Sequence, residues 1–445
     1  QEIHNSQTRT KNQTAHLFAR SVDAQTAWDN MGLGTAYELL TELSTPDRMA
    51  SFFGQANYNF DHKYLLSLTF RADGSTKFAP GNQWGYFPSI SGGWALSKEP
   101  FLKDAMPRTD IRLRASWGMS GNNNIGNYSS IAAIGTGTVP FGSTIYPTSY
   151  ESSFVDAGLS WETTKQTNIG LDLGFWDGRL NVIANYYNSI TTDVLYSLGI
   201  PSISGSTSTT TNLGDSKIRN RGFDIQLDAR ILEGPVTWTV GTNFSLNRNK
   251  VLYLAEGVDE IFNNTMRSSP THATKVGYPI GSFLGFRTNG IMSTADYQNV
   301  LKDRAVYVAN NNSFPEGYKL QGPAVPDYSM EYLSPGNVIY NDYNGDGKIT
   351  EDDREVIGSA YPDFTGGFNT RIRWKDFNFG IDFAANLGAQ KRLPNPYSTF
   401  TYGKMPDIYS NLSNELNSRW KQPGDEAHTN IPALYTSVRD LYNLN

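Results

Sequence analysis

The sequence contains no cysteine, so disulfide-stapled folds and thiolate metal centres are excluded. No apolar run approaches the roughly 18 residues that a membrane helix needs, and the mean hydropathy is -0.46. Together these two observations exclude helical membrane proteins. They leave transmembrane β-barrels open, because only alternate residues of a barrel strand face lipid.

Basic blocks and enzyme motifs are also missing. The 445 residues carry 37 Lys and Arg against 43 Asp and Glu, with no basic block that would predict a nucleic-acid partner. The sequence has no Gly-x-Ser-x-Gly, P-loop, dinucleotide or His-Glu-x-x-His motif, and its five histidines are scattered. We therefore expect neither enzyme activity nor nucleic-acid binding. The first residues, QEIHNSQTRTKNQ, have no apolar signal-peptide core, so any export signal is expected to precede them.

Aromatic residues are abundant, with 25 Tyr, 23 Phe and 9 Trp, which argues against acidic disorder. Apolar residues alternate with polar ones in segment after segment, as in 64–71, 168–175, 222–229 and 377–383. We count about ten strands and one or two weaker ones. Their length of about ten to fourteen residues exceeds that of sandwich strands and suits a tilted crossing of a bilayer.

The connections between these strands alternate in length. Short turns are predicted at 61–63, 177–178, 232–234 and 375–376, and long polar segments at 119–164, 190–219, 249–363 and 390–445. All short turns then fall at one end of an antiparallel meander, as in outer-membrane barrels. Trp176, Trp238 and Trp374 lie near the short turns and suit an aromatic girdle, although ordinary strand aromatics are the alternative.

A soluble β-sandwich or propeller would also alternate. Mid-strand Arg, Asp and Asn would face water in a sandwich, and a wet lumen in a wide barrel. Because the barrel accounts for both faces and for strand length, the predicted fold is all-β, an antiparallel transmembrane β-barrel with long extracellular loops.

Residues 63–103 contain Arg71-x-Asp73-Gly74-Ser75, then the run from Trp84 to Ser89, then Trp94 and Glu99-Pro100-Phe101. This stretch closely resembles the SusC/RagA family of TonB-dependent outer-membrane transporters of Bacteroidetes. Further segments that agree follow in the expected order, at 113–128, 159–180, 220–227, 345–368 and 419–425. The resemblance covers most of the chain.

The resemblance implies active import of a glycan oligosaccharide or an oligopeptide across the outer membrane of a Gram-negative bacterium. It implies a 22-stranded barrel with a plug domain, a SusD-like lid lipoprotein and energy from TonB, usually in a two-barrel, two-lid assembly. We expect residues 1–445 to be a barrel segment, with the plug domain, TonB box and remaining strands outside this chain. The alternative is a non-transporting, surface-exposed, Ca²⁺-stabilised β-rich binding protein. No residue decides between glycan and peptide.

A calcium-type loop is predicted at 342–353, DYNGDGKITEDD, within the long extracellular region 249–363. Gly347 permits the sharp bend by which alternate oxygens converge on one cation. Asp353 stands where a Glu is usual and neither flank reads as a long helix, so a polar turn is the alternative. The predicted ligands of one structural Ca²⁺ are Asp342, Asn344, Asp346, the Lys348 carbonyl and Asp353.

Aromatic residues in the long loops are candidate substrate contacts. They stand among Asn, Ser and Thr, so aromatic rings would stack on sugars or clamp a peptide while amides supply hydrogen bonds. Packing within the loops is the alternative. The candidates are Tyr128, Tyr146, Tyr150, Tyr397 and Tyr402, with Phe400 beside the last two.

Overall fold

The structure is a computed structural model that describes most of the chain. Within the residues that the structure describes, side chains are described from residue 47 onward, except for 263–266 and 269–270. Contacts divide the chain into unit 1 (residues 1–259 and 363–387) and unit 2 (residues 260–362 and 388–445). The described residues are 2–10, 13–20, 36–43, 47–127, 129–132, 134–142, 144–151, 154–200, 203, 208–266, 269–328, 333–391 and 417–433.

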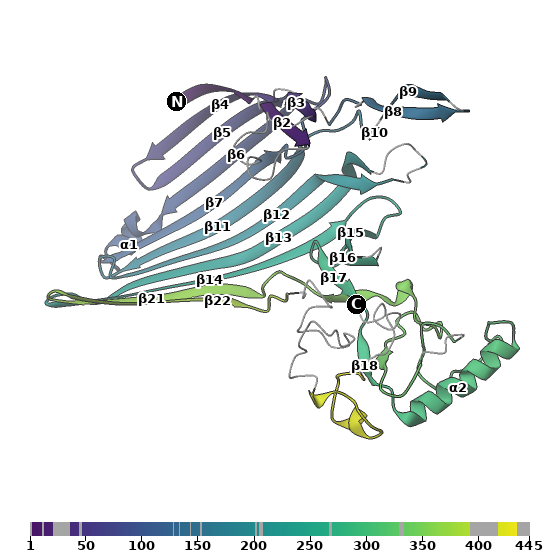
Figure 1. Cartoon of the computed structure of the whole chain (residues 1–445). Coiled ribbons are helices and arrows are strands. Elements are labelled where there is room, and N and C mark those ends of the chain that lie inside the picture. Colours follow the sequence, from purple (N-terminus) through teal and green to yellow (C-terminus); the bar gives the residue numbers. More distant parts are fainter. Residues whose placement is uncertain are drawn as a thin grey trace. The chain divides into compact units, whose positions relative to one another are not determined.

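Unit 1 is dominated by one curved antiparallel sheet (Figure 1). A short strand, β10 (Phe154–Val155), adds to it by pairing in parallel with β13. The sheet confirms the predicted all-β antiparallel class and the expected number of strands. In spatial order its strands are β1 (Glu2–Thr10), β4 (Asp47–Phe60), β5 (Tyr64–Ser75), β6 (Trp84–Ala95), β7 (Thr109–Asn122), β11 (Glu162–Phe175), β12 (Leu180–Gly199), β13 (Ser208–Leu232), β14 (Val236–Tyr253), β21 (Phe364–Trp374) and β22 (Phe377–Leu387).

The four short turns are confirmed, since β4 and β5, β11 and β12, β13 and β14, and β21 and β22 are joined directly. Asp61 and His62 both have φ of 52°, and Trp176 and Asp177 have φ of 53° and 57°. Two successive residues with positive φ give a turn whose twist matches that of the flanking strands. These turns set the register of each hairpin.

The predicted loop at 190–219 is wrong in extent. β12 has 20 residues and β13 has 25, and their ladder runs from Leu180 opposite Ala229 to Gly199 opposite Ser208. One register shift between Thr192 and Val194 interrupts it. Alternation disappears from the sequence here because both faces of the extended hairpin contain polar residues, while backbone pairing continues regardless of side-chain type.

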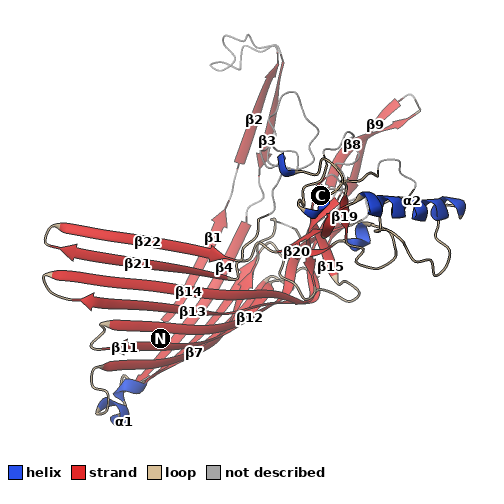
Figure 2. Cartoon of the chain, turned by 90° about the horizontal axis from the view of Figure 1, so that it is seen from below, coloured by secondary structure: helices blue, strands red, loops and turns tan. Residues whose placement is uncertain are grey.

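Two further hairpins belong to unit 1 (Figure 2). One lies within the predicted long connection 119–164, and the other lies near the N-terminus. Short helices follow β6. These elements are β2 (Gln13–Arg20) with β3 (Ala36–Leu43), β8 (Ile134–Phe141) with β9 (Thr144–Glu151), η2 (Leu96–Lys98) and α1 (Pro100–Lys103).

Unit 2 contains most of the predicted long region 249–363, and it has a fold of its own. A helix, α2 (Thr294–Ala309), starts at a capping box of Ser293 and Asp296. Buried Val300 and Tyr307 of α2 pack with Tyr328 in the core of the unit. The other elements are β15 (Glu260–Met266), β16 (Ser269–Lys275), β17 (Ser282–Gly285), β18 (Thr288–Ile291), β19 (Val338–Tyr340), η4 (Glu351–Asp353), β20 (Glu355–Gly358) and η6 (Asp425–Ala427).

A buried carboxylate fixes the segment that follows α2. Asp303 is fully buried and accepts hydrogen bonds from the Tyr318 hydroxyl at 2.8 Å and from the backbone N–H of Gly322 at 2.8 Å. Such a carboxylate would be costly to bury without these donors. Among the described residues, no helix is both long enough and apolar enough to cross a membrane.

Candidate functional site

The main sheet has two chemically different faces. In register across five strands, Asn57, Ser67, Ser91, Ser116 and Asn168 lie side by side. We call the side of the sheet that carries this row the polar face, and the opposite side the apolar face. The next row along the strands lies on the apolar face and consists of Ala56, Leu68, Ile90, Trp117 and Thr167.

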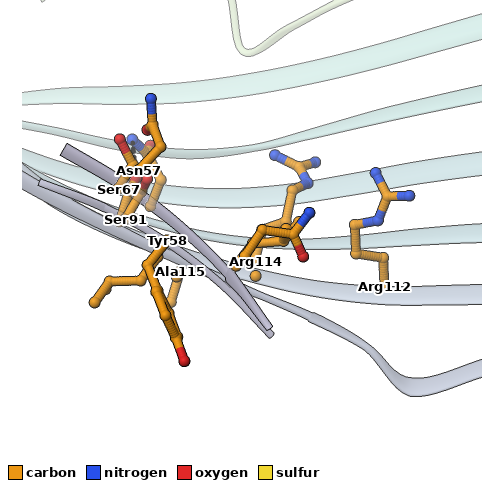
Figure 3. A pocket seen from close by; sticks show the side chains of 15 residues that line it. Asn57, Tyr58, Ser67, Ser91, Arg112, Arg114 and Ala115 are labelled. Carbon is orange, nitrogen blue, oxygen red and sulfur yellow. Dashed lines mark hydrogen bonds between the residues drawn. The ribbon is translucent and has the colours of Figure 1, made fainter. Parts of the chain in front are cut away.

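Figure 3 shows this division directly, since Asn57, Arg112 and Arg114 point to one side of the sheet and Tyr58 to the other. A hollow of about 560 Å³ extends over β4 to β11 at this place. Amides and hydroxyls line one part of it and the two arginines the other. Its lining on the polar face comprises Asn57, Asn59, Leu65, Ser67, Ser91, Gly93, Arg112, Arg114, Ser116, Asn168 and Gly170.

Arg114 lies flat across the polar face. Its guanidinium donates two hydrogen bonds to Asp172 at 2.9 and 2.6 Å and a third to Asn185 at 3.0 Å, so it connects β7 to β11 and β12. Gly170 makes this possible, because a Cβ there would lie 2.9 Å from the Arg114 guanidinium carbon. The charge is held by a bidentate pair and does not project away from the sheet.

Tyr187 makes an equivalent crossing between β12 and β14. Its ring passes over Gly222 on β13, where a Cβ would lie 2.6 Å from the phenolic oxygen, and its hydroxyl donates to Asn247 at 3.1 Å. Long side chains that lie over glycines therefore connect strands that are not neighbours. The polar face is consequently well hydrogen-bonded and suited to contact with water or a polar body.

The hallmark residues of the sequence form a packed corner at the end of the sheet away from the short turns. Arg71 pairs with the 5% exposed Asp73 at 2.6 Å. Phe87 and Phe78 pack on Trp161, whose indole N–H donates to the Gln83 carbonyl at 2.9 Å. The motif thus folds the loop between β5 and β6 onto the polar face.

Aromatic side chains border the apolar face near the short turns. Tyr64 stacks with Trp94, with ring centroids 6.3 Å apart. The Tyr64 hydroxyl and the Trp94 indole N–H both donate to Glu99, at 2.8 and 3.0 Å, and these bonds lower the pKa of the Glu99 carboxyl. Trp176 and Trp374 are 58% and 50% exposed near other short turns. Aromatics with an apolar body and a polar tip suit a membrane interface.

The loop predicted to bind Ca²⁺ lies in unit 2. The Asp342 carboxylate accepts the backbone N–H groups of Gly345 and Gly347, at 2.7 and 2.8 Å. Asn344 accepts the N–H of Asp346 at 2.9 Å. Gly347 has φ of 84°, as the expected sharp bend requires. The first three predicted ligands are therefore brought into one tight turn, and their oxygens keep further lone pairs.

Asp353 has a different environment. It is 1% exposed, and its two oxygens accept the backbone N–H groups of Tyr343 at 2.9 Å and Thr350 at 2.7 Å. Within the described ranges, no group of three or more His, Cys, Asp and Glu side chains is close enough to hold a metal ion. The predicted ligand from Lys348 is its carbonyl oxygen; its backbone N–H donates to the Asp346 carboxylate at 2.8 Å. Calcium at this loop remains a prediction.

Two of the five candidate substrate residues can be placed. Tyr146 and Tyr150 are 54% and 52% exposed on β9, opposite Val139 and Gly135 of β8, and they share one face of that hairpin. The other three, Tyr128, Tyr397 and Tyr402, lie outside the described residues, as does Phe400. The sequence predicted mid-strand Arg on the wet face of the sheet but did not identify the Arg114 network as a site, although an Arg facing a Gly in alternating strands was a usable signal.

An antiparallel sheet of long strands, with one wet face, one apolar face and tight turns at one end, defines the class of transmembrane barrel walls. The family described as "TonB dependent receptor-like, beta-barrel" matches residues 6–334, and the chain belongs to this family. The resemblance to SusC/RagA-type transporters is thereby confirmed. Barrels of this family are outer-membrane proteins of Gram-negative bacteria.

Named relatives support this assignment. "TonB-dependent receptor P3" of Formosa agariphila is 32% identical over 392 residues, which are 86% of this chain and 36% of the relative. "TonB-dependent receptor SusC" of Bacteroides thetaiotaomicron is 30% identical over 393 residues, 84% of this chain and 35% of the relative. The chain therefore spans about a third of the length of these relatives.

Among solved structures, one titled "Structure of the RagAB peptide transporter" shares the fold, with a TM-score of 0.72 and 22% identity. The similarity covers 97% of this chain and 43% of that one. It extends the agreement in fold to nearly the whole chain.

Proposed function

We propose that this chain forms part of the wall of a SusC-type outer-membrane importer that takes up a glycan oligosaccharide or an oligopeptide with energy from TonB. The observation that carries the proposal is the two-faced main sheet. Its polar face suits a lumen filled with water and a plug domain, and its apolar face suits lipid. A plug domain and remaining strands complete the barrel in the proposed assembly.

In the proposed orientation, the short turns face the periplasm and the long connections face the cell exterior. The unequal connections support it, because outer-membrane barrels have short periplasmic turns. The cell-surface end would then carry the β8–β9 hairpin and a SusD-like lid lipoprotein. Tyr146 and Tyr150 are proposed to contact substrate there, since both rings are exposed on one face of that hairpin.

The experiment is uptake by a strain that lacks the gene and carries the full-length protein on a plasmid. Fluorescent oligopeptides and fluorescent oligosaccharides are supplied separately, with and without a functional TonB system. We expect uptake of one class, lost without TonB and reduced when Tyr146 and Tyr150 are both replaced by Ala. Surface binding that persists without energy-dependent uptake would instead favour a non-transporting binding protein.

We further propose that the loop at 342–353 holds one structural Ca²⁺. The turn that brings Asp342, Asn344 and Asp346 close together supports the proposal, because the carboxylates of Asp342 and Asp346 repel one another unless a cation neutralises them. Asp353 would bind the ion only if its carboxylate gave up the hydrogen bonds that it accepts from the backbone N–H groups of Tyr343 and Thr350. An extracellular loop needs an affinity of only about 10⁻⁴–10⁻³ M for occupancy.

A further inference from the structure

Five basic side chains gather on the apolar face, at the end opposite the short turns. In one row, Lys165 of β11, Arg219 of β13 and Lys250 of β14 are in register, with Ile190 of β12 between the first two. In the adjacent row, Arg221 lies opposite Arg248. We call these five cations the basic border.

The basic border directly follows apolar residues of the same face. Strand residues two positions apart point to the same side, so Arg221 shares a face with Phe223, and Arg248 shares it with Leu246. Phe223 packs on Tyr186, with ring centroids 4.9 Å apart. The change from aromatic and aliphatic side chains to cations therefore takes place between one row and the next on the same face.

Most of the positive charge in the border is uncompensated by the part of the protein that the structure describes. Arg248 pairs with Asp363 at 2.8 Å. Lys165, Arg221 and Lys250 are exposed and form no ion pair with a described acidic residue. The Nε atom of Arg219 is buried and has no hydrogen-bond partner among the described residues.

The opposite end of the same sheet differs. There Arg108 pairs with Asp177 at 2.7 Å and Arg230 pairs with Glu233 at 3.0 Å. Two arginines near the short turns are thus paired with carboxylates of the protein itself, whereas within the described ranges Lys165, Arg221 and Lys250 of the basic border are not. The exposed, unpaired cations of the border are available to an anion from outside the described chain.

The spacing places this border at the depth of lipid headgroups. Eleven residues of β13 separate Leu232, beside its short turn, from Arg221. At roughly 3.4 Å per residue and a tilt of about 40°, they would span about 29 Å across a membrane, close to the apolar band of roughly 25 Å seen in outer-membrane barrels.

We propose that the basic border binds the phosphate groups of anionic lipid headgroups in the leaflet opposite the short turns. This inference rests on the proposed function, because it requires the sheet to lie in a membrane. Guanidinium groups bind phosphate oxygens through paired, charge-assisted hydrogen bonds, and the two lysines add point charges. The continuity of the border with the apolar band favours a lipid over a free phosphate or an acidic protein.

The test uses the purified full-length protein in nanodiscs of phosphatidylcholine with and without diphosphoryl lipid A. A triple variant, R219Q/R221Q/K250Q, removes three cations of the border. The matched control, K98Q/K103Q/K375Q, removes three cations near the short turns. Retention of lipid A is measured by native mass spectrometry, and insertion is measured separately by heat-modifiable mobility.

We expect the border variant to retain at least about tenfold less lipid A than the parent, since each cation near an anionic surface contributes roughly fivefold. The control should match the parent, and high salt should weaken retention in both. Competition by inorganic phosphate alone, or equal retention by border variant and control, would overturn the inference while leaving the importer proposal intact. Failure of the parent to insert would overturn both.

Discussion

Replacing Leu68 by Arg tests the assignment of the two faces. Leu68 is 46% exposed on the apolar face, with Ala56 and Ile90 beside it in register. Ser67, the next residue, points to the polar face and accepts a hydrogen bond from Gln55 at 3.2 Å. The two substitutions add the same side chain one residue apart, so their difference isolates the environment of each face.

Leu68 lies in the middle of β5, away from both ends of the strand. A lipid-facing Arg near the bilayer midplane costs about 2–4 kcal/mol. That corresponds to roughly a 30- to 900-fold decrease in the folded-to-unfolded ratio. Ser67→Arg places its guanidinium among Asn57 and Ser91, where water remains available, and should be nearly silent.

The assay is urea unfolding of the full-length protein in lipid vesicles, followed by heat-modifiable mobility and tryptophan fluorescence. A destabilised Leu68→Arg beside an almost unchanged Ser67→Arg is the expected result. Equal destabilisation by the two variants would refute the assignment of the apolar face to lipid. Destabilisation by Ser67→Arg alone would reverse the faces.

Three further outcomes are expected. Gly170→Ala should destabilise the protein by about 1–3 kcal/mol in urea unfolding, because its Cβ would lie 2.9 Å from the Arg114 guanidinium carbon. The control Gly174→Ala, with no contact closer than 3.5 Å, should have little effect. Equal effects would contradict the passage of Arg114 over Gly170. Chelator should speed proteolysis of 342–353 in the parent but not in Asp346→Ala, and an unchanged parent would leave the loop a simple turn. Because hydrogen bonds lower the pKa of Glu99, its contribution to the free energy of unfolding should be present above the unfolded pKa of about 4.3 and should disappear as pH falls through the lower folded pKa. Glu99→Gln should abolish that pH dependence of the unfolding midpoint. A pH profile that is unchanged in the variant would refute the role of Glu99.

Features set by local chemistry were predictable from the sequence. The alternation in 64–71 predicted the two faces, since neighbouring strand residues always point to opposite sides. The turn at 61–63 was predictable because its residues tolerate positive φ. The family resemblance then identified the barrel, and its hallmark Trp84 packs over Gly74, where a Cβ would lie 3.0 Å from the indole.

Features set by pairing between distant segments were not predictable. The Arg114 network depends on the registers of β7, β11 and β12, which bring Asp172 and Asn185 beside it. The basic border likewise needs registers that no local pattern reveals. In the calcium-type loop, spacing predicted the tight turn that holds Asp342, Asn344 and Asp346, but the backbone hydrogen bonds that Asp353 accepts depend on the folding of the whole turn.

The crossings over glycine have a mechanical consequence. Arg114 on β7 bonds with Asn185 on β12, two strands away, and Tyr187 on β12 bonds with Asn247 on β14. Separating β7 from β11 must therefore break a bidentate ion pair and a long-range link together with the backbone ladder. A force that pulls one strand away from its neighbour therefore also acts on the strand beyond it, so the sheet resists separation along a single pair of neighbouring strands.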